Sequence, residues 1–346
     1  MLTIRKGFEI TVLLILLSAC GKPEKRLPTL DEVKVNRAFA CVYEKKNLPQ
    51  LSPEADQLYR YARYVQKNNL LKEDISVYPE LERLFRIATA HNHYKANLEL
   101  RQMIGKGHAW SADPVKETLD LTEELIRQGV PGGYYDMARY IEAGYGVKQD
   151  PELALRYYRK SADLGSPDGQ SWVAEKLAPL DHAPEVARQM RHCAADQGSG
   201  SAADSLGRDY KGDKAYPEAV KIFHTGVKNG NETSAAELEA AFSGPDASDT
   251  FNYLGLLKDV ERADRYKKIA DVLGRYSYLH PTVPELDEIV PLPPAKLPPW
   301  DGKIQWQKNH EANVAPPKPS EELIAKLAKA KNLDPKTGRP VGADHS

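Results

Sequence analysis

The chain has 346 residues and a formal net charge of −1 at pH 7, and charged residues make up 28% of it. This balance offers neither the basic surplus typical of nucleic-acid binding nor the acidic block typical of a solvating tail. The length allows one substantial hydrophobic core or an elongated array of repeats.

The first residues have the order of parts of a bacterial secretion signal. Basic Arg5 and Lys6 precede the apolar run VLLILL, and small residues then lead to Cys20. The apolar run is far shorter than the roughly 20 residues that span a bilayer. The string Leu-Ser-Ala-Cys-Gly resembles the lipobox of bacterial lipoproteins, which implies cleavage before Cys20 and lipidation of its thiol. The alternative is a plain secretory signal with an incidental cysteine.

Residues 1–19 are therefore predicted to be a lipoprotein signal peptide, and the polar residues 20–30 a tether. Gly21, directly after the lipidated position, resembles the choice that sorts lipoproteins to the outer membrane. We accordingly expect a chain anchored in the outer membrane by lipid alone and facing the periplasm.

Two further cysteines, Cys41 and Cys193, form an even pair in an oxidising compartment, which permits a disulfide. A bond requires their Cα atoms to lie within about 7 Å, and sequence alone leaves open the alternative of two buried free thiols.

From residue 31 to about residue 278 the composition favours helix. Apolar residues recur at helical spacing, as in Leu81, Leu84, Phe85 and Ala88, and no stretch alternates like a strand. The fold class is therefore predicted to be all-α, with residues 31–93 as an N-terminal helical region.

Residues 94–278 are repetitive. Prolines suited to the first turn of a helix recur at separations of 37, 33 and 33 residues, and a glycine suited to end a helix follows each: Pro114 and Gly129, Pro151 and Gly165, Pro184 and Gly198, Pro217 and Gly230. A helix pair of this size does not bury its own apolar face and must stack on its neighbours. The prediction is an α-solenoid of helix-turn-helix repeats.

The clearest unit spans residues 134–165 and reads Ala-x-Tyr-x3-Gly-x-Gly-Val-x2-Asp-x3-Ala-x2-Tyr-Tyr-x3-Ala-x2-Gly. This spacing resembles the Sel1-like repeat, a relative of the tetratricopeptide helix pair. The resemblance is specific in this unit and partial in the others. It implies a protein-binding array.

The segment 279–310 changes character, because residues 281–299 hold seven prolines. Its apolar residues and the anchors Trp300 and Trp306 predict a strap lying against the solenoid, with a disordered linker as the alternative. The string PLPPAKLPPWDGKIQW resembles the C-terminal domain of Sel1-like lipoproteins of Gram-negative bacteria. Residues 311–346 are expected to form a short helix and a loose tail.

The motif His91-Asn92-His93 invites two interpretations, a metal site, which is disfavoured, and phospholipase D chemistry, which fails. Zinc sites need three or four ligands, and no third ligand is evident. The phospholipase D pattern His-x-Lys-x4-Asp breaks at Leu100, where the aspartate should stand. No nucleophile elbow, phosphate loop or dinucleotide fingerprint is present. We therefore expect no catalytic residues, no metal and no cofactor.

Tyrosines crowd the clearest repeat, and exposed tyrosines suit protein recognition. The candidate partner-binding residues are Tyr134, Tyr135, Arg139, Glu142 and Tyr145.

Lipoproteins that combine such repeats with a Pro-Pro-Trp-Asp-Gly tail resemble immunity proteins that neutralise phospholipase effectors of type VI secretion. The resemblance implies a cognate phospholipase toxin as partner and blockade of its active-site mouth, which we expect to use acidic and tyrosine contacts. An envelope scaffold or regulator without a toxin partner is the alternative. An enzyme using His91 and His93 is the least favoured.

Overall fold

The computed structural model describes residues 26–35, 38–179 and 182–342, so the signal peptide and Cys20 lie outside the described part. Its helices are α1 (Leu30–Val35), α2 (Pro53–Asn69), α3 (Tyr78–Ala90), α4 (Tyr94–Gly105), α5 (Pro114–Arg127), α6 (Pro131–Ala143), α7 (Pro151–Asp163), α8 (Pro167–Leu177), α9 (Pro184–Asp196), α10 (Gly200–Gly212), α11 (Tyr216–Lys228), α12 (Glu232–Phe242), α13 (Val260–Arg275), α14 (Leu286–Ile289), α15 (Gln305–Ala312) and α16 (Glu321–Ala330). Short 3-10 turns are η1 (Glu44–Lys46), η2 (Ile75–Val77) and η3 (Ser277–Leu279).

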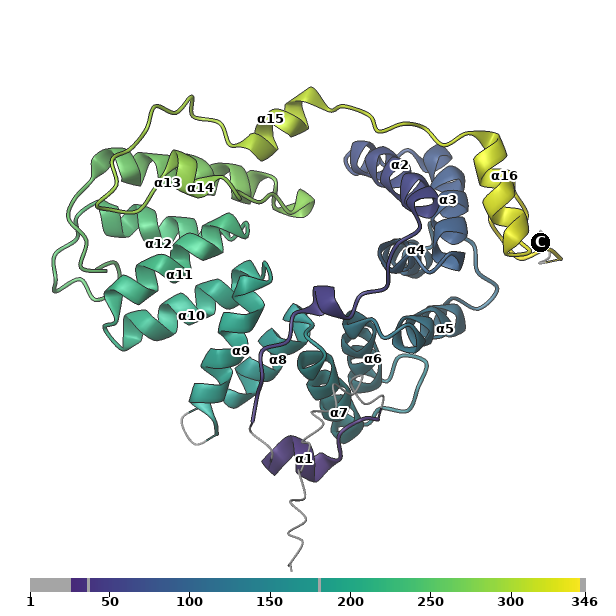
Figure 1. The fold of residues 1–346 in the computed structure, drawn as a ribbon, viewed down its shortest axis with the longest axis horizontal. Coiled ribbons are helices and arrows are strands. Elements are labelled where there is room, and N and C mark those ends of the chain that lie inside the picture. Colours follow the sequence, from purple (N-terminus) through teal and green to yellow (C-terminus); the bar gives the residue numbers. More distant parts are fainter. Residues whose placement is uncertain (1–25, 36–37, 180–181, 343–346) are drawn as a thin grey trace, which may run out of the picture.

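Helices α2 to α13 pack as successive antiparallel pairs, each pair on the one before, which confirms the predicted all-α solenoid. Figure 1 shows that the array curves round a central opening, with α15 lying across the gap between its last and first helices. In the described ranges the one β feature is an isolated bridge between Leu333 and Pro340.

The prolines, aspartate caps and glycines identified in the sequence begin and end helices at the predicted positions. Helices α5, α7 and α9 begin at Pro114, Pro151 and Pro184, and Asp113 and Asp150 cap the first two through their carboxylates. The terminating glycines all have positive φ, from +79° to +103°: Gly129, Gly165, Gly198 and Gly230. Pro131 and Pro167 open α6 and α8 in the same way.

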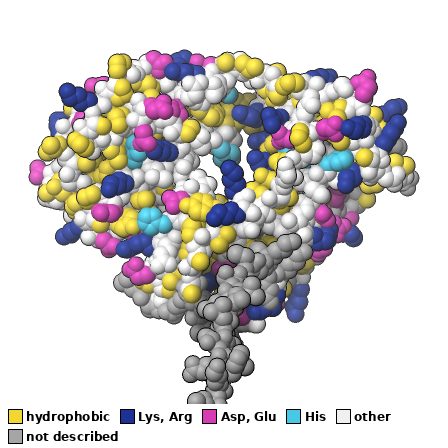
Figure 2. Space-filling model, viewed as in Figure 1, with side chains coloured by type: hydrophobic (Ala, Val, Ile, Leu, Met, Phe, Trp, Pro, Cys, Tyr) yellow, Lys and Arg dark blue, Asp and Glu magenta, His cyan; other side chains and the backbone are white. Residues whose placement is uncertain are grey.

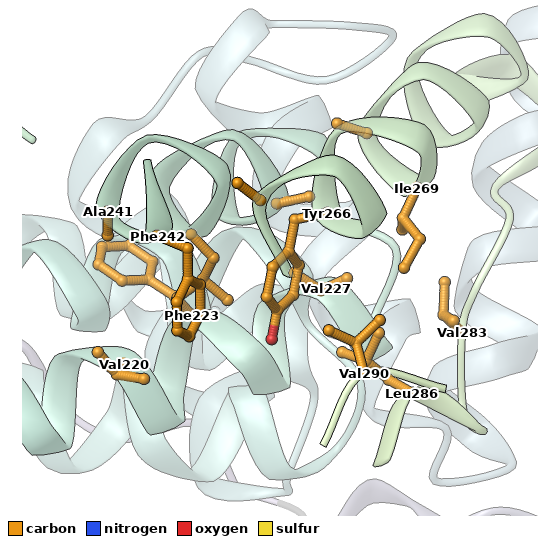
Figure 3. Packing of buried hydrophobic residues seen from close by; sticks show 14 of the residues in the cluster. Val220, Phe223, Val227, Ala241, Phe242, Tyr266, Ile269, Val283, Leu286 and Val290 are labelled. Carbon is orange, nitrogen blue, oxygen red and sulfur yellow. The ribbon is translucent and has the colours of Figure 1, made fainter. Parts of the chain in front are cut away.

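The strap caps the last repeat. Val283, Leu286, Val290 and Ile304 are buried, and they join the core that Phe223 of α11 and Tyr266 of α13 form (Figure 3). His224 locks this contact, because its ring nitrogens lie 2.8 Å from the Tyr266 hydroxyl and 2.8 Å from an Asp287 carboxylate oxygen. The strap therefore completes a hydrophobic core that the final helix pair would leave open.

The C-terminal helix caps the other end of the array. Ile324, Leu327 and Ala328 of α16 are buried in the core formed by α2, α3 and α4. Residues 331–342 continue along α3, where Arg339 binds the buried carboxylate of Glu82 through two hydrogen bonds of 2.9 and 3.0 Å. Residues 331–342 are therefore not a loose tail, because Arg339 holds them against α3 by neutralising the buried Glu82 carboxylate.

The gap between the two capped ends is bridged by α15 and the proline-rich residues 313–320, which are mostly exposed apart from the buried Pro319. Asn313 binds Asn68 of α2 through paired amide hydrogen bonds of 2.8 and 3.2 Å. The C-terminal third thus joins the last helix pair to the first and closes the solenoid into a ring. No helix in the described ranges is both long and apolar enough to cross a bilayer.

Candidate partner-binding surface

Residues 38–47, here called the N-terminal arm, run along the inner side of the ring toward the opening (Figure 1). Cys41 of the arm is disulfide-bonded to Cys193 of α9, with a Cα–Cα distance of 5.6 Å. The bond joins positions 152 residues apart. The arm is therefore fastened covalently to the middle of the solenoid, far along the chain from its own position.

Polar contacts hold the arm on both sides of this bond. The Glu44 amide donates to Gln197 Oε1 at 2.6 Å, and the Val42 carbonyl accepts from Gln170 Nε2 at 3.1 Å. Asn47 Nδ2 donates to the Leu164 carbonyl at 2.7 Å. The arm thus satisfies its backbone groups on the turns between repeats, as a bound extended peptide would.

Gly165 makes this path accessible. Besides its φ of +103°, a Cβ atom at this position would lie 2.7 Å from the Val42 carbonyl oxygen and 2.7 Å from the Glu44 amide nitrogen. Gly198, one repeat later, has φ +101° and open space around it. The helix-stop glycine at position 165 therefore serves a second purpose, because the arm crosses it, and the glycine at position 198 does not.

Glu44 turns inward from the arm to the start of α6. The Gly132 backbone lies beside this carboxylate and acts to lower its pKa, at a helix start where Val130 offers no side-chain cap. Burial and the nearby charge of Asp168 nevertheless raise the pKa of Glu44 to about 7. Burial, with the charge of Asp136, also raises the pKa of Asp168. Glu44 is half-buried, whereas Asp168 is exposed at the start of α8.

The clearest repeat forms a surface depression of about 560 Å³ over α6 and the turn that follows it, lined by Asp136, Arg139, Tyr140, Glu142, Ala143 and Tyr145. It brings together three of the predicted partner-binding residues. Arg139 is exposed and makes no ion pair or hydrogen bond with other described residues. Glu142 is exposed and accepts a 2.7 Å hydrogen bond from the Tyr158 hydroxyl.

The other two predicted partner-binding residues, Tyr134 and Tyr135, pack between helices. Tyr134 is 4% exposed and packs beside Tyr157, with ring centroids 6.1 Å apart, so its ring is not on the surface. Tyr135 is half-buried and meets the Tyr158 ring edge-on at 5.5 Å. Both side chains act mainly in inter-helix packing, because each helix of a pair buries its aromatic face against the other.

The tryptophans of the strap lie on α13 and just beyond it. The Arg265 guanidinium lies over the Trp300 ring at 5.7 Å, and Trp300 Nε1 donates to the Lys303 carbonyl at 3.0 Å. Trp306 packs between Tyr276 and His310, with ring centroids 5.3 and 5.0 Å away.

The histidines considered for catalysis have structural roles. His93 accepts the Ala96 amide hydrogen through Nδ1 at 3.1 Å and so caps α4, while its Nε2 lies 3.3 Å from Asp56. His91 Nε2 lies 2.9 Å from the Leu327 carbonyl of α16. Within the described part of the chain, no group of three potential ligands could hold a metal ion.

Two family models match parts of the chain. The Sel1 repeat matches residues 131–166, which are α6, α7 and the turn to α8. The Domain of unknown function (DUF6396) matches residues 234–341, which begin in α12 and include the strap and α16. A search of curated proteins finds no significant match.

Solved structures from Pseudomonas aeruginosa share the fold over nearly their whole length. The protein PA5086 is 28% identical with a TM-score of 0.58, and the alignment covers 74% of this chain and 95% of that one. The immunity protein Pa5087 is 26% identical, with a TM-score of 0.57 and coverage of 74% and 95%. The immunity protein PA5088 is 25% identical, with a TM-score of 0.57 and coverage of 75% and 95%. The chain thus carries a Sel1 repeat within a fold that it shares with immunity proteins.

Proposed function

We propose that this chain is a lipid-anchored immunity protein that binds and blocks a phospholipase effector delivered by type VI secretion. The observation that carries the proposal is the similarity to the immunity proteins Pa5087 and PA5088, which extends over 95% of each. Similarity of this extent includes the architecture as a whole and not only a common repeat. The enzyme target and the secretion route rest on the resemblance of the repeats and the Pro-Pro-Trp-Asp-Gly tail.

The described surface suits protein binding. Solenoids of helix pairs commonly present extended surfaces to other proteins. The depression over α6 offers Arg139 and Glu142 as exposed groups of opposite charge, which can pair with complementary groups of a partner. The ring is held by the disulfide, the strap and α16, and such preorganisation reduces the entropy lost on association.

Lipidation at Cys20 would place this surface at the membrane that a phospholipase attacks. The proposed anchor is tested by comparing the full chain with its Cys20→Ser variant after cell fractionation. The full chain should sediment with outer membranes and the variant should appear in the soluble periplasmic fraction. Recovery of the unchanged chain in the soluble fraction would refute the lipid anchor at Cys20. It would leave the proposed binding of a toxin unaffected.

The function itself is tested with the phospholipase encoded by the neighbouring gene. The chain lacking its signal peptide should bind that enzyme and suppress its hydrolysis of phospholipid vesicles at equimolar concentration. An unrelated lipase should keep its full activity in the same assay. Absence of binding would refute the proposal, whereas binding without inhibition would favour the scaffold alternative.

A further inference from the structure

The turn η1, at the end of the N-terminal arm, is ordered without being part of a core. None of its residues is buried, and Lys45 and Lys46 are exposed. Fixing such a segment costs conformational entropy that burial of its own side chains does not offset. The disulfide from Cys41 and the hydrogen bonds of Glu44 and Asn47 supply the fixation instead. Contacts outside the turn, and not burial of its own side chains, therefore hold this exposed turn in one conformation.

The acidic and basic side chains of this turn point in different directions. Its one acidic side chain, Glu44, faces the α6 start at Gly132, where an ideal Cβ would lie 3.8 Å from the carboxylate. The two basic side chains remain in solvent, with Lys46 Nζ 5.9 Å from the Tyr43 ring centroid. Neither lysine forms an ion pair with a described residue. The turn consequently presents only positive charge outward, together with the partly exposed Tyr43 ring.

The position of the turn makes this charge accessible to a partner. Figure 1 places η1 at the inner margin of the ring, and Figure 2 shows a few Lys or Arg side chains beside the central hollow, among groups of other kinds. Exposed Lys95 follows Tyr94 at the start of α4, where burial and then the charge of Glu44 raise the pKa of Tyr94. One acidic group also touches this segment, because the Tyr43 hydroxyl donates to the exposed Asp196 at 3.4 Å.

We propose that Tyr43, Lys45 and Lys46 form a basic knob that docks on an acidic surface of the protein partner. The inference rests on the proposed function, because it assigns a contact to the same binding event. It differs from the expectation of acidic and tyrosine contacts drawn from the sequence. The exposed charges of the turn itself are basic and form no ion pair with a described residue, and a positively charged partner surface would be repelled there.

The test is the double charge reversal Lys45→Glu with Lys46→Glu, compared with Lys296→Glu with Lys336→Glu. The control lysines are also exposed and without described ion pairs, and they lie on the strap and the C-terminal tail. Both variants change the net charge equally. Binding to the neighbour-encoded phospholipase is measured by surface plasmon resonance at low and high ionic strength. A thiol assay on unfolded protein confirms that the Cys41–Cys193 bond is intact in both.

The knob variant should bind on the order of 10-fold or more weakly, mainly through slower association, and the control should bind like the unchanged chain. High salt should narrow the difference, since screening weakens exposed charge contacts. Equal binding by both variants would overturn the basic knob and leave the immunity role standing. If the unchanged chain itself fails to bind, the proposed function falls, and this contact falls with it.

Discussion

Substitution of Gly165 by alanine isolates the arm's contribution, because Gly198 is its matched control. Both glycines end a helix at nearly the same φ, +103° and +101°. A new Cβ at position 165 would meet the arm at Val42 and Glu44, whereas a Cβ at position 198 would meet nothing within 4 Å.

The strain of a left-handed alanine, about 1–2 kcal/mol, is common to both variants. At position 165 the added methyl lies 2.7 Å from backbone atoms that the Cys41–Cys193 bond holds in place. Relief requires the arm to move, with a cost comparable to overpacking a core, about 1–3 kcal/mol. The Gly165→Ala variant should therefore be less stable than Gly198→Ala by about 1–3 kcal/mol.

Urea unfolding followed by far-UV circular dichroism, under oxidising conditions, measures both free energies of unfolding. Protection of the Glu44 amide against hydrogen exchange, which depends on its bond to Gln197, should fall in Gly165→Ala only. Equal destabilisation of the two variants, with unchanged protection of Glu44, would refute the packing of the arm over Gly165.

Three further predictions concern the contacts that close the structure. Replacing Cys41 by serine should lower the free energy of unfolding by about 2–4 kcal/mol, and reductant should then have no further effect; urea curves with and without reductant decide this. Ile324→Lys places a charge in the core under α16 and should cost about 3 kcal/mol or more, while Ala330→Lys on its exposed face should change stability by about 0.5 kcal/mol at most; similar thermal shifts would contradict the docking of α16. The pKa of Glu44 in the folded chain is raised to about 7. Its contribution to the free energy of unfolding is therefore fully present below pH 4.5 and is lost as pH rises through 7. From pH 5 to pH 8 the unchanged chain should lose about 2–3 kcal/mol relative to Glu44→Gln, and parallel pH profiles would refute this.

Local sequence signals predicted the repeats well, because each acts over a few residues. A proline in the first turn, an aspartate cap and a left-handed glycine specify where a helix begins and ends whatever surrounds it, and Pro151, Asp150 and Gly165 do so for α7. The apolar periodicity then requires the pairs to stack. The solenoid follows from these local rules together with the need to bury one face of each pair.

The candidate surface was predicted only in part. Arg139, Glu142 and Tyr145 line one depression because one helix and its following turn carry all three. Tyr134 was misassigned because sequence spacing does not reveal which face of α6 meets α7, and its ring is buried. No sequence signal marked Lys45 and Lys46, since two adjacent lysines are ordinary on any solvated surface.

By itself, the sequence determined the helices, their pairing and the presence of a proline-rich segment with apolar anchors, because propensity, caps and periodicity are short-range properties. Only the tertiary structure decided that the chain closes into a ring and that the N-terminal arm crosses its inner side. Those features depend on contacts such as Cys41 with Cys193 and Arg339 with Glu82, between positions separated by 152 and 257 residues. Whether such groups meet depends on the accumulated curvature of the stacked helix pairs, which no local pattern encodes.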